Sequence, residues 1–303
     1  MKALLIGFGS IGKRHFEILK ELKCIESIDI ISQQTINGIK IFRNLADVDD
    51  LNIYDYFVIA SETEKHYVQL NYICSRVSGK KILVEKPLYE KNHQLIKNRN
   101  KIFVAYNLRF HSVIEKLRYL IDGKNVYYVN AICGQYLPTW RPDRDYRQSY
   151  SASTIRGGGV LRDLSHELDY LIWMFGSFDK INAINAKISD LEIESDDIFT
   201  AIAITSKKII INLTIDYISK EPIRRLLIHV QDETIEVDII NNIIRTINKQ
   251  GDNKLIELEP KERNYSYCKM HQSILVEDSL MACNFEEGLK VMDVISTVKF
   301  SDL

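Results

Sequence analysis

The chain has 303 residues, of which 46% are hydrophobic and 27% are charged, and its formal net charge is −1. This is an ordinary globular composition, and the chain is long enough to form two domains. The near-neutral charge indicates no nucleic-acid partner and no membrane-surface role. No apolar run reaches the ~20 residues of a membrane helix, and the five cysteines contain no C-x-x-C pair. We therefore expect a cytoplasmic protein with neither a disulfide framework nor a metal site.

The first third of the chain alternates β-rich runs with helical patterns. The predicted strands are 2–6, 28–32, 57–60, 81–84 and 102–105. The predicted helices are 11–22, 64–77 and 89–98. This alternation is typical of a doubly wound parallel sheet, so we expect an N-terminal α/β domain.

A glycine-rich stretch, GFGSIG at 7–12, follows the first strand and precedes the first helix. Gly7 allows a tight turn, Gly9 lets the backbone approach a pyrophosphate, and Gly12 lets helix and strand pack closely. The phosphates would bind at the positive end of the helix. The alternative is a tight turn without a ligand, but the flanking strand and helix favour dinucleotide binding. The predicted cofactor contacts here are Gly7, Phe8, Gly9, Ser10, Ile11 and Gly12.

The second strand lacks the acidic residue that usually binds the ribose of NAD. It ends Ile31-Ser32-Gln33-Gln34, and Asp29 comes too early for this role. Ser32 and Gln33 can bond a hydroxyl or a 2′-phosphate, and no arginine follows at once. The sequence therefore leaves the cofactor as NAD or NADP.

Three later stretches carry a family resemblance: KKILVEKPL at 80–88, YNLRFH at 106–111 and GGGVLRDLSHELDYLIWMFG at 157–176. In this order and spacing the chain resembles the Gfo/Idh/MocA oxidoreductases from Lys2 to about Gly176, and again weakly at 285–295. The resemblance implies a Rossmann domain over 1–112 and a C-terminal α/β domain with a large, mostly antiparallel sheet over 113–303. It further implies a nicotinamide cofactor, a sugar or polyol substrate, and a homodimer or homotetramer formed through that sheet.

The resemblance also assigns residues on the cofactor side. The family's Glu-Lys-Pro motif falls on Glu85, Lys86 and Pro87, and its lysine lies beside the reacting carbon. The Thr-Pro-x-x-x-His stretch falls on 61–66, where only His66 is retained. We expect Ser61, His66, Glu85 and Lys86 near the cofactor, with packing at a helix start as the alternative for His66.

The family's Asp-x-x-x-His pair falls on Asp163 and His166, one residue closer than usual. Residues three apart on a helix share one face, so both side chains are predicted to reach one substrate. His166 has a suitable intrinsic pKa for a general base, and Lys86 can stabilise the developing alkoxide. Asp163 would bind a substrate hydroxyl or orient His166.

Arginines suggest the substrate class. The segment 137–150, LPTWRPDRDYRQSY, joins a predicted strand at 126–133 to the Asp163 helix, so we expect it to cover the pocket. Arginines bind phosphate or carboxylate with paired hydrogen bonds. The alternative is a solvated loop, because Asp143 and Asp145 balance part of the charge. The predicted substrate-binding residues are Arg109, Arg141, Arg144, Arg147, Arg156, Asp163 and His166.

The second half is β-rich and closes with two helical patterns, 265–280 and 285–300. The predicted strands, which suggest antiparallel pairing, are 181–188, 198–205, 209–217, 225–231, 234–240, 243–248 and 252–260. The whole sequence predicts an NAD(P)-dependent oxidoreductase acting on an anionic sugar, nucleotide-linked or acidic, of surface-glycan metabolism. The alternatives are a non-catalytic dinucleotide-binding regulatory protein and an NAD-dependent glycoside-cleaving enzyme.

Overall fold

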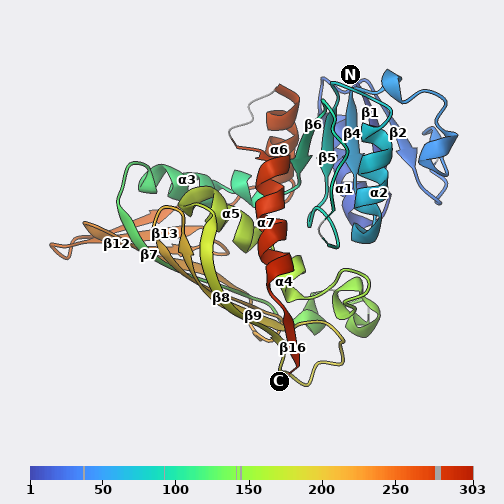
Figure 1. Cartoon of the computed structure of the whole chain (residues 1–303). Helices are drawn as coiled ribbons and strands as arrows, with labels where there is room; N and C mark the ends of the chain where they lie inside the picture. Colours follow the sequence, from blue (N-terminus) through green and yellow to red (C-terminus); the bar gives the residue numbers. More distant parts are fainter. Residues whose placement is uncertain (37, 92, 141, 144, 277–280, 303) are drawn as a thin grey trace. The chain divides into compact units, whose positions relative to one another are not determined.

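The computed structural model describes residues 1–302 except 37, 92, 141, 144 and 277–280, and the chain divides into two compact units (Figure 1). The first unit comprises Met1–Phe110 and Glu262–Met292, and the second comprises His111–Lys261 and Asp293–Leu303. The sequence predicts domains over 1–112 and 113–303. The first boundary lies close to the observed one, but the prediction places residues 262–292 in the second domain. Residues 262–292 return to the first unit, where α6 (Tyr265–Val276) packs on α1 (Ser10–Glu21).

The first unit is built on a seven-stranded sheet in the order β15-β6-β5-β4-β1-β2-β3. Strands β1 to β6 pair in parallel, and β15 pairs antiparallel with β6. Burial along β1, β4 and β5 is almost continuous, as expected for parallel strands covered on both faces. The strands are β1 (Lys2–Ile6), β2 (Ser27–Ile31), β3 (Ile41–Phe42), β4 (Tyr56–Ile59), β5 (Lys81–Val84), β6 (Lys101–Val104) and β15 (Cys283–Asn284).

Helices flank this sheet, with α1 against β1 and β2 and α2 against β4. The apolar residues of α1 recur at helical spacing, so Ile18 and Leu19 reach the core. The helices are α1 (Ser10–Glu21), α2 (Thr63–Cys74), α6 (Tyr265–Val276) and α7 (Phe285–Thr297), with short 3-10 helices at η1 (Leu45–Asp47), η2 (Leu51–Ile53) and η3 (Asn107–Phe110).

The helix predicted over 89–98 is wrong. The described residues of this segment form no helix, and polar groups of α2 bind its backbone instead. Tyr67 Oη donates to the carbonyl of Gln94 at 3.1 Å, and Ile96 N donates to Asn71 Oδ1 at 3.4 Å. These contacts hold the backbone away from helical geometry, so tertiary packing overrides local propensity.

The second unit is built on a nine-stranded sheet in the order β14-β13-β12-β11-β7-β10-β9-β8-β16. Its pairs are antiparallel except for β7 with β10 and β8 with β16, so the predicted mostly antiparallel sheet is confirmed. All seven strands predicted from 181 onward are present; those at 198–205 and 243–248 have the predicted bounds, and the other five have shifted ends. The strands are β7 (Val126–Gly134), β8 (Phe178–Lys187), β9 (Ile198–Thr205), β10 (Ile210–Asp216), β11 (Ile223–Val230), β12 (Glu233–Asp238), β13 (Ile243–Asn248), β14 (Asn253–Glu257) and β16 (Phe300–Asp302).

The two faces of this sheet differ. Helices α3 (Ser112–Ile121) and α5 (His166–Phe175) lie along one face, while within the described chain no helix of the unit lies on the other (Figure 1). The uncovered face carries isoleucines that are 36–58% exposed: Ile184, Ile202, Ile204 and Ile210. Between β7 and α5 run η4 (Leu137–Thr139), η5 (Tyr146–Gln148), η6 (Tyr150–Ala152) and α4 (Val160–Asp163).

Candidate active site

The three glycines of the turn after β1 differ in whether the fold has room for a side chain in their place. A Cβ on Gly7, whose φ is +96°, would lie 2.6 Å from the Ala60 carbonyl oxygen. A Cβ on Gly12 would lie 2.2 Å from the Gly7 carbonyl oxygen. A Cβ on Gly9 would meet no atom of the described chain within 4 Å, and its φ of −73° suits any residue. The fold therefore requires Gly7 and Gly12, whereas Gly9 leaves an open space that fits a close backbone approach by a pyrophosphate.

The N-terminus of α1 borders this open space. Gly9 is its N-cap, and among the described residues neither a side-chain cap nor a first-turn carboxylate satisfies the helix N–H groups. Such a helix end carries partial positive charge and favours an anion. The residues present at 7–12 therefore fit the phosphates of a dinucleotide.

An arginine that the sequence analysis missed lies at the end of β2. Arg43 Nη1 donates to the carbonyl oxygens of Ser32 at 3.2 Å and Gln34 at 3.4 Å, and Arg43 has no carboxylate partner among the described residues. It follows β3, which is only two residues long and pairs in parallel with β2. Asp29 is engaged elsewhere, by Tyr54 Oη at 2.6 Å and Lys2 Nζ at 2.9 Å.

The end of β5 forms a tightly bonded turn at Glu85 and Lys86. The Glu85 carboxylate is 6% exposed, and its Oε2 accepts from the Lys86 backbone N at 3.1 Å. The peptide between Lys86 and Pro87 is cis. Lys86 itself is partly exposed.

The His66 side chain contacts this turn through one ring nitrogen. Its Nδ1 lies 3.1 Å from the Pro87 carbonyl oxygen and its Nε2 lies 3.2 Å from that of Ser61. Ser61 Oγ in turn donates to Gln69 Oε1 at 2.7 Å. Burial lowers the pKa of His66, although the carbonyl contacts and Glu85 act in the opposite direction. These contacts support the packing alternative for His66, since both ring nitrogens face backbone oxygens of the protein.

Within the first unit, the ends of three strands therefore meet. Gly7 after β1 packs on Ala60 and Ser61 after β4, and His66 links Ser61 to the turn after β5. Ligands of doubly wound sheets bind at this carboxyl edge. The structure thus brings together the predicted cofactor-side residues that follow β1, β4 and β5.

In the second unit, Asp163 and His166 do not share one helix, so that expectation is wrong. Asp163 ends α4 and His166 begins α5, with Leu164 (φ −98°, ψ 25°) and Ser165 between them. Asp163 is buried, and its Oδ2 accepts from Ser151 Oγ and Tyr217 Oη, both at 2.6 Å. His166 is partly exposed at the start of α5.

Asp196 explains the separate short helix α4. Its Oδ2 accepts from the Leu161 backbone N at 2.8 Å, and its carbonyl oxygen accepts from Val160 N at 3.0 Å. A Cβ on Gly159 would lie 2.1 Å from Asp196 Oδ1, so the glycine run is needed for this packing. Burial raises the pKa of Asp196 to about 6. These contacts fix α4 independently of α5.

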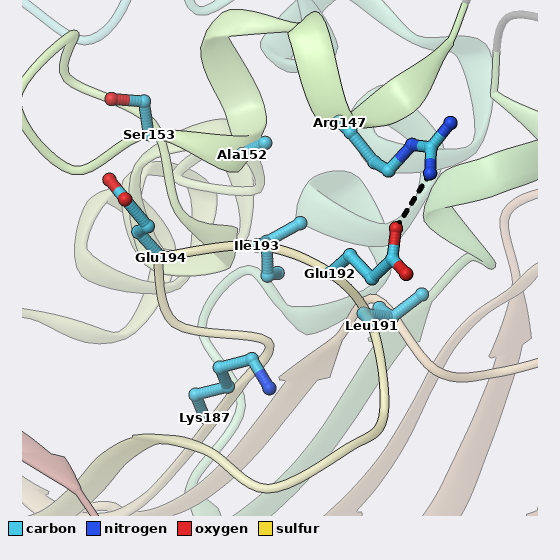
Figure 2. A pocket seen from close by; sticks show the side chains of 8 residues that line it. All are labelled: Arg147, Ala152, Ser153, Lys187, Leu191, Glu192, Ile193 and Glu194. Carbon is cyan, nitrogen blue, oxygen red and sulfur yellow. Dashed lines mark hydrogen bonds and ion pairs between the residues drawn. The ribbon is translucent and has the colours of Figure 1, made fainter.

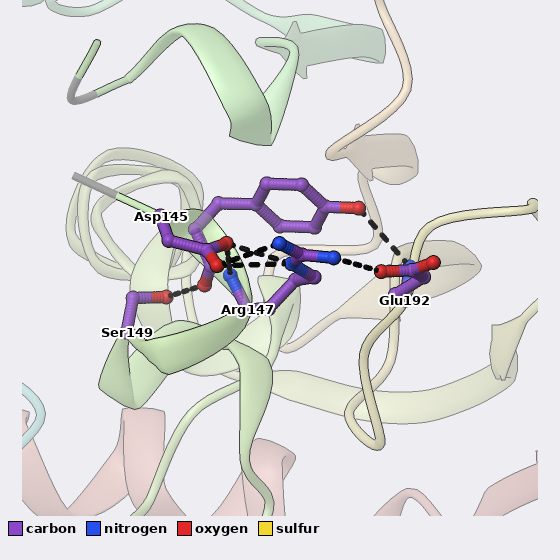
Figure 3. Close-up of polar contacts among 5 residues, drawn as sticks. Asp145, Arg147, Ser149 and Glu192 are labelled. Carbon is purple, nitrogen blue, oxygen red and sulfur yellow. Dashed lines mark hydrogen bonds and ion pairs between the residues drawn. The ribbon is translucent and has the colours of Figure 1, made fainter. Parts of the chain in front are cut away.

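The predicted arginine cluster is largely occupied by protein partners. Arg141 and Arg144 lie outside the described residues. Arg147 pairs with Asp145 and Glu192, each at 2.8 Å, so its charge is balanced on the surface (Figure 3). Arg156 is exposed and donates to the Gln148 carbonyl at 3.2 Å.

Arg109 differs from the other arginines because it is buried in the first unit. It is 1% exposed and donates to Glu287 Oε2 at 2.8 Å. Its guanidinium is therefore shielded from solvent and already bonded to a carboxylate of the protein. We therefore leave Arg109 out of the proposed substrate site.

A shallow hollow of about 480 Å³ lies beside the Arg147–Glu192 ion pair in the second unit (Figure 2). Lys187 projects into it and donates to the Ser189 carbonyl at 2.8 Å. Its lining contains neither Asp163 nor His166, so it is distinct from the predicted catalytic residues. The lining residues are Arg147, Ala152, Ser153, Lys187, Leu191, Glu192, Ile193 and Glu194.

Comparison with known proteins confirms the predicted resemblance. Residues 114–236 match the sequence model of the GFO/IDH/MocA C-terminal domain. No curated protein sequence matches the chain significantly. Over the described residues, no helix has the length and apolarity needed to cross a membrane.

Solved structures share the fold over nearly the whole chain. UDP-N-acetylglucosamine 3-dehydrogenase GnnA from Acidithiobacillus ferrooxidans is 18% identical with a TM-score of 0.73, covering 97% of this chain and 95% of its own. Levoglucosan dehydrogenase in complex with NADH and levoglucosan is 16% identical with a TM-score of 0.79, covering 96% and 94%. An oxidoreductase from Agrobacterium radiobacter in complex with NAD+, L-tartaric acid and magnesium is 16% identical with a TM-score of 0.82, covering 97% and 94%.

Proposed function

We propose that this chain is an NAD(P)-dependent dehydrogenase of sugars. It has the fold of the GFO/IDH/MocA oxidoreductases and matches their C-terminal domain over 114–236. The observation that carries the proposal is the turn at 7–12. Gly9 leaves open space at an uncapped helix N-terminus, which no packing of the described chain explains. A dinucleotide pyrophosphate does explain it.

The proposed chemistry is oxidation of a sugar hydroxyl or the reverse reduction. A bound nicotinamide supplies the hydride acceptor or donor. His166 takes the hydroxyl proton as general base, and the Lys86 ammonium hydrogen-bonds the same oxygen and stabilises its developing negative charge. Asp163, fixed by Ser151 and Tyr217, orients a substrate hydroxyl or His166. That Lys86 and His166 act on one substrate is part of the proposal.

Arg43 bears on the choice between NAD and NADP. The acidic residue that excludes a 2′-phosphate is missing after β2. The Arg43 guanidinium lies there instead, and it has no carboxylate partner in the described part of the chain. Arginine at this position accommodates a 2′-phosphate. We therefore propose that the chain accepts NADP as well as NAD.

For the substrate we propose an anionic sugar, nucleotide-linked or acidic. Of the predicted arginines, Arg156 supports this because its described contact is a backbone carbonyl and its charge is exposed. The Arg147 ion pairs do not support it. GnnA is by name a dehydrogenase of UDP-N-acetylglucosamine, whereas levoglucosan dehydrogenase binds levoglucosan, so anionic and neutral sugars both belong in the assay.

The uncovered face of the nine-stranded sheet supports a homodimer or homotetramer. Ile202 and Ile204 on β9 and Ile210 on β10 are 36–58% exposed on adjacent strands. A contiguous apolar stripe of this kind marks an association surface. In light scattering, Ile202→Lys is expected to lower the mass of the particle, whereas Ile155→Lys, in a loop where the side chain is 87% exposed, leaves it unchanged.

The test of the proposed function is absorbance of reduced nicotinamide with panels of nucleotide sugars, sugar acids and neutral polyols. Lys86→Ala and His166→Ala are each expected to lower kcat by roughly 10²–10⁴-fold. Lys65→Ala, at an exposed lysine paired with Glu62, is the matched control and keeps full rate. Turnover of neutral polyols alone would refute the anionic substrate. Cofactor binding without turnover of any sugar would favour a regulatory protein.

A further inference from the structure

Four buried side chains form one continuous row of hydrogen bonds in the first unit. Tyr56 Oη lies 2.8 Å from His271 Nδ1, and His271 Nε2 lies 2.8 Å from His15 Nδ1. His15 Nε2 lies 2.9 Å from Glu85 Oε1. The two histidines and Tyr56 are 0% exposed, and Glu85 is 6% exposed. Four separate elements therefore meet in this row: β4, α6, α1 and the end of β5.

The chemistry of the two ends fixes the order of donors. An ionised carboxylate only accepts, so His15 must donate to Glu85 from Nε2. With neutral imidazoles, His15 Nδ1 then accepts from His271 Nε2–H, and His271 Nδ1 accepts from the Tyr56 hydroxyl. Both histidines are thereby the Nε2–H tautomer. Burial raises the pKa of Tyr56 well above its usual value, so its hydroxyl keeps the proton that this order requires.

Other charged and titratable groups surround the row. The Tyr267 ring, on α6, lies 5.6 Å from the His15 ring, and the Arg14 guanidinium lies 5.2 Å from the Tyr267 ring. Burial, and secondarily His15, lowers the pKa of His271 well below its usual value, which favours a neutral His271. The Glu85 carboxylate contacts the row directly, through His15 Nε2.

The row ends at the turn that carries Lys86. Glu85 uses Oε1 for His15 and Oε2 for the Lys86 backbone N, so one carboxylate joins the histidines to that turn. We propose that His15 and His271 are positioning residues, which hold the Glu85 carboxylate in one orientation and thereby fix the Lys86 turn. The effect of His15 and His271 on turnover rests on the proposed function, whereas the order of hydrogen-bond donors in the row does not.

The first test measures tautomers in the full-length protein without substrate. Long-range proton–nitrogen NMR of the imidazoles at neutral pH is expected to show His15 and His271 as single, neutral Nε2–H tautomers. The signals are assigned by their loss in His15→Gln and His271→Gln. A His15 that carries its proton on Nδ1, or that populates both tautomers equally, would overturn the proposal.

The second test compares two substitutions of His271. The amide of His271→Gln can still donate toward His15 Nδ1, whereas His271→Leu removes the donor and leaves a buried nitrogen unsatisfied. We expect His271→Leu to lower kcat by about tenfold or more, while His271→Gln restores it. Equal kcat in the two variants would overturn the positioning role. Absence of turnover in the wild type would refute the proposed function, and the NMR result would still decide the order of donors.

Discussion

Substitution of Gly9 by alanine separates the folding role of the glycine turn from its binding role. The added Cβ meets no described protein atom within 4 Å, and the φ of −73° suits alanine. The unfolding free energy is therefore expected to change by less than about 0.5 kcal/mol. The same methyl group occupies the space proposed for the pyrophosphate. We expect the cofactor Kd to rise at least about tenfold, which corresponds to ~1.4 kcal/mol.

Gly12→Ala is the matched comparison. Its Cβ would lie 2.2 Å from the Gly7 carbonyl oxygen, so the backbone of the turn must move. Overpacking of this kind costs roughly 1–3 kcal/mol of stability. Thermal unfolding and titration calorimetry with NAD and NADP distinguish the two variants. A Gly9→Ala variant that folds normally and binds cofactor with wild-type affinity would refute the assignment of this turn.

Three further outcomes follow from individual contacts. Glu167→Gln removes the charge of a fully buried carboxylate that pairs with the partly exposed Arg224 at 2.7 Å. It is expected to cost about 3 kcal/mol in chemical denaturation, and a loss below about 1 kcal/mol would contradict this. Arg43→Ser is expected to weaken NADP binding about tenfold while leaving NAD binding unchanged, and equal effects on both cofactors would exclude a 2′-phosphate contact. The pKa of Asp196 is about 6 in the folded chain against 3.8 when unfolded. Its contribution to the free energy of unfolding is therefore present below pH 3.8 and is lost as the pH rises through 6. The total loss is about 3 kcal/mol. Asp196→Asn should remove that loss, and wild-type-like pH dependence of its unfolding would argue against a raised pKa.

Local sequence signals predicted the fold well where neighbouring residues determine the geometry. The strand, glycine turn and helix over 2–21 are confirmed because apolar periodicity and Gly7 act within a few residues of each other. The antiparallel runs of the second half are confirmed for the same reason. The helix predicted over 89–98 failed because distant polar groups, such as Asn71 and Tyr67, bind that backbone.

The candidate site required contacts that local sequence does not reveal. The break between Asp163 and His166 depends on Asp196, which caps α4 from a distant loop. His15 and His271 are 256 residues apart and meet only because residues 262–292 return to the first unit. No periodicity or spacing rule signals such a pair.

The central claim, that this chain transfers a hydride between a nicotinamide and a sugar carbon, is tested most directly with sugars carrying carbon-bound deuterium. Mass spectrometry of the cofactor is expected to show a single deuterium transferred by the wild type, and transfer by Lys86→Ala that is slower by roughly 10²–10⁴-fold. If the cofactor remains free of deuterium while a sugar is converted, the account of this protein as a dehydrogenase is contradicted.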